Sequence, residues 1–233
     1  MRLSKRMHCL ASLVTEGSRL ADVGTDHGYV PIYLVENRRI PSAIAMDINR
    51  GPLARAEEHI KRAGLSTYIE TRLSDGLAGL RPGEADSILI AGMGGMLVIR
   101  ILEEGMHCLY TEKELILQPQ SDIPAVRRWL YEHQYRIVTE DILQEDWKYY
   151  PMMKAVHGQE RKPEPEELYC GKWTVQRSPA VLSGYLQAKL AENQKIMQTL
   201  QQSGNGDTKR AEEVEKAMDI INRILEDRKE DFK

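Results

Sequence analysis

The chain has 233 residues, 42% hydrophobic and 29% charged, with a formal net charge of −3, which argues against disorder and gives no global sign of nucleic-acid binding. Its three cysteines, Cys9, Cys108 and Cys170, form no paired motif, so we expect neither a disulfide framework nor a zinc knuckle, and a reducing compartment fits best. The apolar run at 7–14 is too short for a signal peptide and no run would cross a bilayer, so we expect a cytoplasmic protein without a membrane segment.

The first 133 residues predict a regular alternation of strands and helices. After an amphipathic helix over 1–15, we expect five strands, at about 20–23, 43–46, 67–73, 86–90 and 114–117. The helices expected to follow the strands end near Asn37, cover 51–62 and 96–104, and run from a cap at Asp122 to about His133. This alternation is typical of an α/β sheet wound on both faces.

The pattern changes after residue 133. Residues 135–143 and 149–156 predict two strands joined by a short acidic turn, which is a hairpin added to the parallel sheet. Residues 158–180 contain several prolines and glycines and are expected to form a connecting segment, and residues 181–233 predict two helices with a break at 203–207. We therefore expect one domain at 1–160, and a linker with a helical domain at 161–233.

The two C-terminal helices predict an antiparallel coiled-coil hairpin. Apolar positions alternate at spacings of three and four residues, and Asn193 is suited to setting the register of the seam. The seam positions are Leu186, Leu190, Asn193, Met197 and Leu200 in the first helix, and Ala211, Val214, Met218, Ile221 and Leu225 in the second. Basic and acidic residues balance in this region, so the hairpin is not a basic clamp.

Four strand ends carry polar or glycine-rich groups, at 24–28, Asp47, 75–76 and 91–95. In a doubly wound sheet the ligand lies over the carboxyl ends of the strands, and an acidic residue at the position of Asp47 accepts bonds from ribose hydroxyls. The carboxylate of Asp75 is suited to accept a hydrogen bond from the exocyclic amine at the edge of an adenine. The carboxylate of Asp26 would repel a pyrophosphate, so the first loop favours a cationic or neutral ligand over a dinucleotide.

Each of these residues also has a structural interpretation. Asp47 fits a helix N-cap, and Asp75 fits an ordinary Asp-Gly turn. The glycines at 92–95 fit a tight strand-to-helix turn, and His27 fits a loop histidine bonded to the backbone. The other histidines are scattered without ligand spacing, so no metal site is expected. The ordered occurrence of all four strand ends is what favours a binding site.

The terminal hairpin favours one class of nucleotide-binding sheet. Seven-stranded S-adenosylmethionine (SAM) methyltransferases insert their last strand antiparallel, whereas nicotinamide-binding domains continue with helical crossovers. Four motifs then occur in order, DVGTDHGYVP at 22–31, DINRGPL at 47–53, IAGMGG at 90–95 and LQP at 117–119. With these motifs the whole chain, including the C-terminal hairpin, closely resembles the TrmK family of bacterial tRNA (adenine-N1)-methyltransferases.

The resemblance implies a seven-stranded, Rossmann-like methyltransferase sheet and methyl transfer from SAM to N1 of the adenosine at tRNA position 22. It also implies that Asp26 lies next to the target base and acts in catalysis. The cofactor-binding residues that we predict are Asp22, Gly24, Asp26, His27, Gly28, Asp47, Ile48, Asp75, Gly76, Ala91, Gly92 and Met93. Family members often carry Asn after Gln-Pro, whereas this chain has Gln120, to which we give no catalytic role.

The tRNA partner suggests basic residues as phosphate contacts. Lysine and arginine outnumber acids over residues 1–62, although a solvated helix surface is the commoner explanation for such an excess. The candidate phosphate contacts are Arg2, Lys5, Arg6, Arg127 and Arg128. The oligomeric state is not fixed by the sequence, and a monomer is compatible with it.

Two other functions compete with tRNA methylation. The first is a non-catalytic RNA-binding or assembly protein that retains a SAM-type pocket and works through its helical hairpin. The second is a nicotinamide oxidoreductase, which the Asp26 loop and the missing later crossovers disfavour. Binding of tRNA without turnover would identify the first, and a calorimetric titration of SAM against NAD would identify the second.

Overall fold

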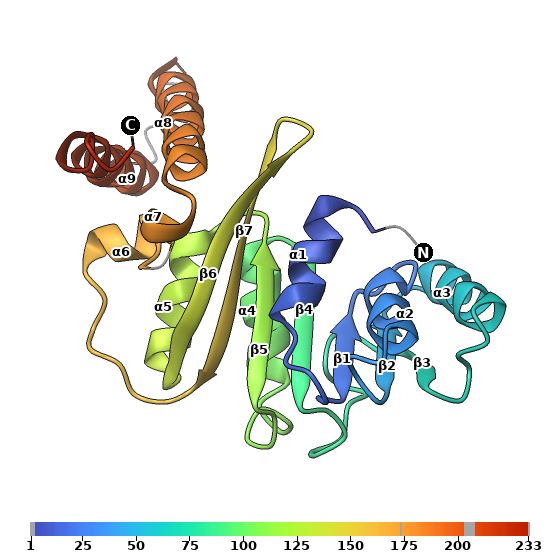
Figure 1. Ribbon diagram of the computed structural model, residues 1–233. Coiled ribbons are helices and arrows are strands. Elements are labelled where there is room, and N and C mark those ends of the chain that lie inside the picture. The colour runs from blue at the N-terminus through green and yellow to red at the C-terminus, as the bar shows by residue number, and fades with distance from the viewer. Residues whose placement is uncertain (1–2, 173, 203–207, 233) are drawn as a thin grey trace. The chain divides into compact units, whose positions relative to one another are not determined.

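The computed structural model describes residues 3–172, 174–202 and 208–232 (Figure 1). The chain divides into two compact units, of which the first comprises Met1–Thr139 and Tyr150–Glu160 and the second Glu140–Tyr149 and Arg161–Lys233. The tip of the predicted hairpin therefore groups with the C-terminal region. The domain boundary that we placed after residue 160 stays a prediction.

The first unit holds most of the sheet and its covering helices. Its elements are α1 (Lys5–Leu13), β1 (Leu20–Val23), α2 (Tyr29–Glu36), β2 (Ala43–Asp47), α3 (Arg50–Arg62), β3 (Ile69–Leu73), β4 (Ser87–Met93), α4 (Gly95–Glu104), β5 (Glu114–Pro119) and α5 (Ile123–Glu132). Strands β6 (Tyr135–Glu145) and β7 (Lys148–His157) form the hairpin and extend into the second unit. Helices α1, α2 and α3 lie over one face of the sheet, and α4 and α5 over the other (Figure 1).

The seven strands form one sheet in the order β3-β2-β1-β4-β5-β7-β6. Strands β1 to β5 pair in parallel, and β7 joins β5 antiparallel with Leu117 opposite Met153. The predicted doubly wound sheet with an inverted terminal hairpin is confirmed. Because β1 to β5 are parallel, their carboxyl ends share one edge, which we call the carboxyl end of the sheet, and their starts share the amino end.

The centre of the sheet is apolar on both faces. Strand β1 is buried along its whole length, and so are Ile88, Leu89 and Ile90 of β4 and Leu115, Ile116 and Leu117 of β5. Helices on both faces shield these strands from water, which explains why they appear in the sequence as continuous apolar runs rather than alternating ones. The buried strands give rigid support to the loops at the carboxyl end.

Several predicted elements differ from the observed ones at their boundaries. Among the described residues α1 begins at Lys5, where Ser4 caps it by accepting a bond from the backbone of Met7 at 3.2 Å. Strand β4 continues to Met93, into the predicted glycine turn. Asp122 stands at the N-cap position of α5, but it makes no side-chain capping bond because Ser121 binds its carboxylate instead.

The second unit is mainly helical. The predicted connecting segment in fact contains α6 (Pro165–Cys170) and α7 (Thr174–Arg177), and α6 begins with a capping box between Glu164 and Glu167 that the prediction missed. Helices α8 (Pro179–Gln202) and α9 (Thr208–Asp227) pack together. All ten predicted seam residues are buried or half-buried, although a true coiled coil stays a prediction, and the break at 203–207 lies outside the described residues.

No helix within the described residues is both long enough and apolar enough to span a membrane. The same part of the chain contains no group of three or more His, Cys, Asp or Glu side chains placed to hold a metal ion.

Candidate active site

The loop between β1 and α2 is tied to the neighbouring strand. The backbone N–H groups of Gly24 and Thr25 both donate to the carbonyl of Met46, at 2.8 and 2.9 Å. Gly24 has φ +74° and Gly28, the N-cap of α2, has φ +69°, which are conformations that favour glycine. A Cβ on Gly28 would lie 3.4 Å from the Cβ of Ala56 in α3, so this glycine also permits close packing of α2 against α3.

Asp22 lies at the base of this loop and is 7% exposed. Its carboxylate accepts a 2.6 Å bond from the hydroxyl of Thr25. Burial raises the pKa of Asp22 to about 6; the Thr25 bond partly opposes that shift, and the negative charge of Asp47 adds to it. A cation bound nearby would therefore be stabilised by this carboxylate and would favour its ionised form.

A cavity of about 80 Å³ opens beside the loop. Its walls come from α1, the β1–α2 loop, the start of α2 and the end of β4, through Arg6, Met7, Leu10, Asp22, Gly24, Thr25, Asp26, His27, Tyr29, Val30, Leu89 and Ala91. The structure thus brings the predicted residues at 22–27 together with Ala91. It also adds a wall from α1 that the sequence did not predict.

The predicted adenosine-binding residues follow along the same edge, since β2 and β3 lie next to β1 in the sheet. Asp47 ends β2 and accepts a 2.8 Å bond from the backbone of Asn49, which itself takes the N-cap position of α3. Ile48 is 55% exposed, an apolar surface that a flat base would cover. Asp75 is half-exposed and pairs with Arg100 at 3.4 Å, and Gly76 has φ +53°.

The glycines at the end of β4 and directly after it serve two purposes. Gly92 has φ +78° and lies at the carboxyl end of the sheet, and the side chain of Met93 reaches back to Gly24, where a Cβ would collide with its terminal methyl group. Gly95 is different, because a Cβ there would collide with the backbone of Ser121. The structural interpretation therefore holds for Gly95, which allows α4 to begin against the β5–α5 turn.

Asp26 occupies the rim of the cavity with φ +48°. One carboxylate oxygen lies 2.8 Å from the guanidinium of Arg55 in α3, and the other lies 3.4 Å from Nε2 of His27. Asp26 and Arg55 are both about half exposed, so the ion pair is in contact with solvent and costs little to rearrange. The Asp26 carboxylate is placed to meet a ligand that enters from solvent.

Three rings gather beside Asp26. His27, Tyr29 and His59 stack with centroid separations of 5.0 to 5.4 Å, and Nδ1 of His59 lies 3.0 Å from the carbonyl oxygen of His27. Nδ1 of His27 is buried without a hydrogen-bond partner among the described residues. The ring of His27 thus packs against aromatic rings, while its backbone carbonyl makes the bond to His59.

The predicted phosphate contacts do not form one surface. Arg2 lies outside the described residues, Lys5 and Arg128 are exposed, and Arg6 is half-buried beside the cavity. Arg127 is only 6% exposed, so its prediction as a surface phosphate contact is wrong. The physical reason is helix periodicity, because Arg127 falls on the buried stripe of α5.

Four residues near the site were missed by sequence reasoning: Tyr29, Arg55, His59 and Gln118. Tyr29 directly follows Gly28, and that adjacency is a signal that could have identified it. Gln118 lies in the LQP motif, which could have identified it, whereas Arg55 and His59 come from α3 and no local motif connects them with the loop at 24–28. Only the tertiary fold places them there.

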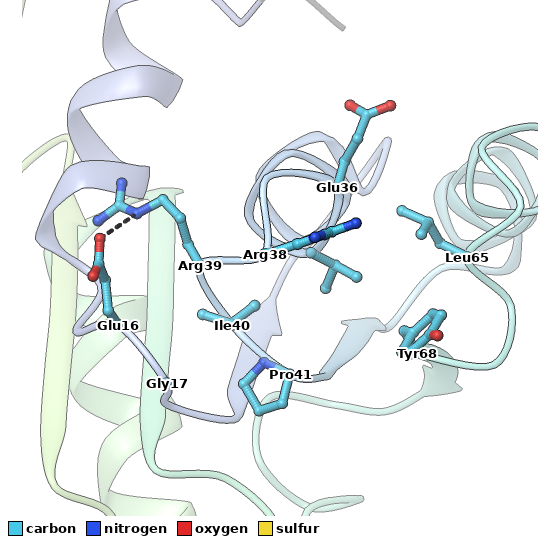
Figure 2. Close-up of a pocket in the computed structure, with 10 residues that line it drawn as sticks. Glu16, Gly17, Glu36, Arg38, Arg39, Ile40, Pro41, Leu65 and Tyr68 are labelled. Carbon is cyan, nitrogen blue, oxygen red and sulfur yellow. Dashed lines mark ion pairs between the residues drawn. The ribbon is translucent and has the colours of Figure 1, made fainter.

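A larger hollow of about 700 Å³ lies at the amino end of the sheet, away from these residues (Figure 2). The segments before β1, β2 and β3 line it, and Figure 2 shows Arg39 directed toward Glu16, with 3.5 Å between Arg39 Nε and a Glu16 carboxylate oxygen. None of the predicted site residues belongs to it.

The sheet order and the acidic and glycine-rich strand ends define the class of protein. Residues 3–153 match the family described as a methyltransferase domain. The chain is therefore a methyltransferase-domain protein with a Rossmann-like sheet, as predicted.

More specific relatives narrow the family. A tRNA (adenine(22)-N(1))-methyltransferase from Bacillus subtilis is 42% identical over 158 residues, which span 68% of this chain and 66% of that protein. The crystal structure of B. subtilis TrmK, a tRNA m1A22 methyltransferase, superposes with a TM-score of 0.87 at 32% identity, covering 96% of this chain and 99% of that one. A Streptococcus pneumoniae protein in complex with S-adenosyl-L-methionine gives a TM-score of 0.85 at 33% identity, covering 96% and 100%. This chain belongs to the TrmK family.

Proposed function

We propose that this protein transfers a methyl group from SAM to N1 of the adenosine at position 22 of tRNA. The observation that carries the proposal is the match to TrmK over 96% of the chain, which includes both the sheet and the C-terminal helices. A tRNA substrate also implies a cytoplasmic location, where tRNA is available to the enzyme.

The carboxyl end of the sheet fits SAM as a cofactor. SAM is a sulfonium, and the buried Asp22 carboxylate, with one side-chain donor and a raised pKa, favours a cationic neighbour. Asp47 is placed to accept ribose hydroxyls, and the exposed Ile48 is placed to cover the adenine face. The residues proposed to hold the cofactor are those predicted from sequence, Asp22, Gly24, Asp26, His27, Gly28, Asp47, Ile48, Asp75, Gly76, Ala91, Gly92 and Met93.

When bound, SAM supplies an electrophilic methyl group. Adenine N1 carries its own lone pair, so the protein does not need a strong base to activate it. Methylation makes the adenine ring cationic and its N6 amino group acidic. The Asp26 carboxylate at the rim of the cavity is placed to stabilise that charge and to accept the N6 proton. We therefore propose Asp26 as the catalytic residue.

The target adenosine has to leave its stacked position to reach the cavity, which costs roughly a few kcal/mol. The aromatic rings of His27, Tyr29 and His59 at the rim offer a surface on which a displaced base can stack. Lys5 and Arg128 are exposed and remain proposed phosphate contacts outside the cavity, together with Arg2.

Primer extension tests the proposal directly. Reverse transcription of tRNA that has been incubated with the protein and SAM should stop at adenosine 22, because a methyl group on N1 blocks base pairing. The matched control is a tRNA with guanosine at position 22, which should give full read-through. Read-through with every tRNA that has adenosine at position 22 would contradict the proposal, and tRNA binding without a stop would favour the non-catalytic alternative.

A further inference from the structure

Arg6 does not behave as a surface residue, although it lies in a helix with an exposed polar side. Its side chain is half-buried and extends from α1 across the ends of β4 and β5. One guanidinium nitrogen, Nη1, donates a 3.0 Å bond to the side-chain oxygen of Gln118, and the guanidinium carbon lies 5.4 Å from the ring centroid of Tyr150. Residues from β5 and β7 thus fix the position of this cation.

Gln118 is well suited to orient Arg6. It is 0% exposed, and its amide nitrogen donates to the carbonyl of Pro119 at 3.3 Å, so that its oxygen faces the guanidinium. A residue that only attracts the phosphates of a passing RNA does not need a buried partner 112 positions away in the chain. The arrangement is typical of a preorganised binding group.

The guanidinium lies at the methyl-transfer end of the site. Nη1 of Arg6 is 3.3 Å from the point that a Cβ on Gly92 would occupy, and Arg6 lines the same cavity as Gly24 and Asp26. A larger residue at position 92 would displace the guanidinium. Gly92, near the end of β4, therefore leaves the space in which Arg6 lies.

The sheet order separates a cofactor side from an acceptor side. The residues proposed for the adenosine part of SAM end β2 and β3, and the loop beside the sulfonium follows β1. On the other side of β1 the order continues through β4 to β5 and β7, and these last two strands carry Gln118 and Tyr150, which contact Arg6. Arg6 therefore belongs to the side from which the acceptor nucleotide enters.

The charge of Arg6 requires an anionic partner. A cation beside the adenine ring would oppose the positive charge that methylation creates there, whereas the phosphates flanking the nucleotide are anionic. A guanidinium has five N–H donors in a planar fork, so the bond to Gln118 is compatible with binding a phosphate at the same time. We propose that Arg6 is a positioning residue that binds a phosphate flanking the target adenosine and holds the displaced nucleotide over Gly92.

This inference rests on the proposed function, and a chemical substitution in the RNA tests it without altering the protein. Two tRNAs are made, with a neutral methylphosphonate linkage on the 5′ side or on the 3′ side of adenosine 22. Binding to the protein is measured in the presence of S-adenosylhomocysteine, and single-turnover methylation is measured with SAM. One of the two linkages should lower both affinity and rate at least tenfold with the unaltered protein.

The matched protein variants are Arg6→Gln, Arg6→Lys and, as a control at the amino end of the sheet, Lys113→Gln, which changes a lysine whose side chain is 74% exposed. Arg6→Gln should lower tRNA affinity at least tenfold and leave SAM affinity, measured by calorimetry, within twofold. Arg6→Gln should bind unmodified tRNA and the tRNA whose methylphosphonate weakens binding to the unaltered protein with equal affinity, because the interaction with that phosphate is already absent. Arg6→Lys should recover only part of the loss, since it lacks the planar fork, and Lys113→Gln should change tRNA affinity by less than threefold.

Two results would overturn the inference. One is a loss of SAM affinity in Arg6→Gln as large as the loss of tRNA affinity, which would assign Arg6 to the carboxylate of the cofactor. The other is insensitivity of the unaltered protein to both methylphosphonates. Failure of the unaltered protein to methylate unmodified tRNA would instead refute the proposed function, while the binding measurements would still decide whether Arg6 holds a phosphate.

Discussion

Two buried carboxylates at opposite ends of the same sheet differ in the number of hydrogen-bond and ion-pair partners that surround them. At the amino end Glu114, 3% exposed, accepts bonds from the backbone and hydroxyl of Thr15, from Ser87 at 2.6 Å, and from the ammonium of Lys154 at 2.7 Å. Burial alone would raise the pKa of Glu114, but these bonds outweigh it and the pKa lies below its ordinary value. The amino end supplies every partner that this carboxylate needs.

The carboxylate of Asp22, at the carboxyl end, has fewer hydrogen-bond partners than that of Glu114. Among the described residues its carboxylate receives one side-chain bond, from Thr25, and the second carboxylate at Asp47 adds repulsion. The pKa of Asp22 is accordingly raised to about 6. In this pair of carboxylates, the one at the amino end finds its partners within the fold, whereas the one at the carboxyl end keeps the capacity to bind a ligand. Substitutions at the two ends should therefore damage different properties.

The largest effect is expected on stability at the amino end. Glu114→Gln leaves the half-buried ammonium of Lys154 without its counter-charge, which should lower the free energy of unfolding by about 3 kcal/mol. Urea unfolding measures this loss. Glu70→Gln is the control, because Glu70 forms an exposed ion pair with Arg72 and should cost less than about 1 kcal/mol. A loss below 1 kcal/mol for Glu114→Gln would mean that the network is not what stabilises this end.

The second effect is expected on turnover at the carboxyl end. Asp26→Asn should lower the single-turnover methylation rate about 100-fold, because the amide cannot accept the N6 proton or stabilise the cationic ring. Its ion pair with Arg55 is exposed, so the free energy of unfolding should change by less than about 1 kcal/mol. SAM and tRNA affinities, measured separately, should stay within a few-fold. A collapse of SAM affinity alone would make Asp26 a cofactor ligand instead.

The sequence predicts the fold better than the site, and the two ends show why. Buried parallel strands and punctuating glycines leave a local pattern, so the sheet is predicted and the residues at the ends of its strands, such as Asp22 and Asp47, are found at the expected edge. Arg55 reaches the site from a helix whose sequence carries no sign of it, and although Arg6 is predicted as a phosphate contact, nothing in its helix indicates that it lines the cavity. Arg127 was misassigned although the apolar residues around it in α5 repeat at helical spacing, a local pattern that predicts its burial.

A third effect is expected on the pH dependence of cofactor binding. SAM should favour ionised Asp22, so its affinity should fall below about pH 6 by up to about tenfold per pH unit and level off above that range. In the protein without ligand, the free energy of unfolding depends on pH with the opposite sign. The pKa of Asp22 is raised above its ordinary value of 3.8, so its contribution to the free energy of unfolding falls as pH rises from about 4 through 6.

Calorimetry at pH 6 in two buffers with different ionisation enthalpies measures the proton released when SAM binds. Asp22→Asn should abolish that release, whereas Glu70→Gln, far from the loop, should not change it. Equal proton release in the protein with and without Asp22 would show that another group titrates, and that the incomplete partnering of Asp22 is not linked to the cofactor.

The smallest effect comes from two glycines that share a backbone conformation but lie at opposite ends of the sheet. Gly17 has φ +79° and open space around it, whereas Gly24 has φ +74° and faces the terminal methyl group of Met93. Alanine at either position should cost about 1 kcal/mol of unfolding free energy, because the left-handed conformation strains any residue with a Cβ. Gly24→Ala should in addition push Met93 toward the cofactor cavity and weaken SAM binding several-fold, while Gly17→Ala should leave SAM affinity unchanged. Equal SAM affinities in the two variants would mean that Met93 turns away without narrowing the cavity, and that the glycine at the carboxyl end serves the backbone alone.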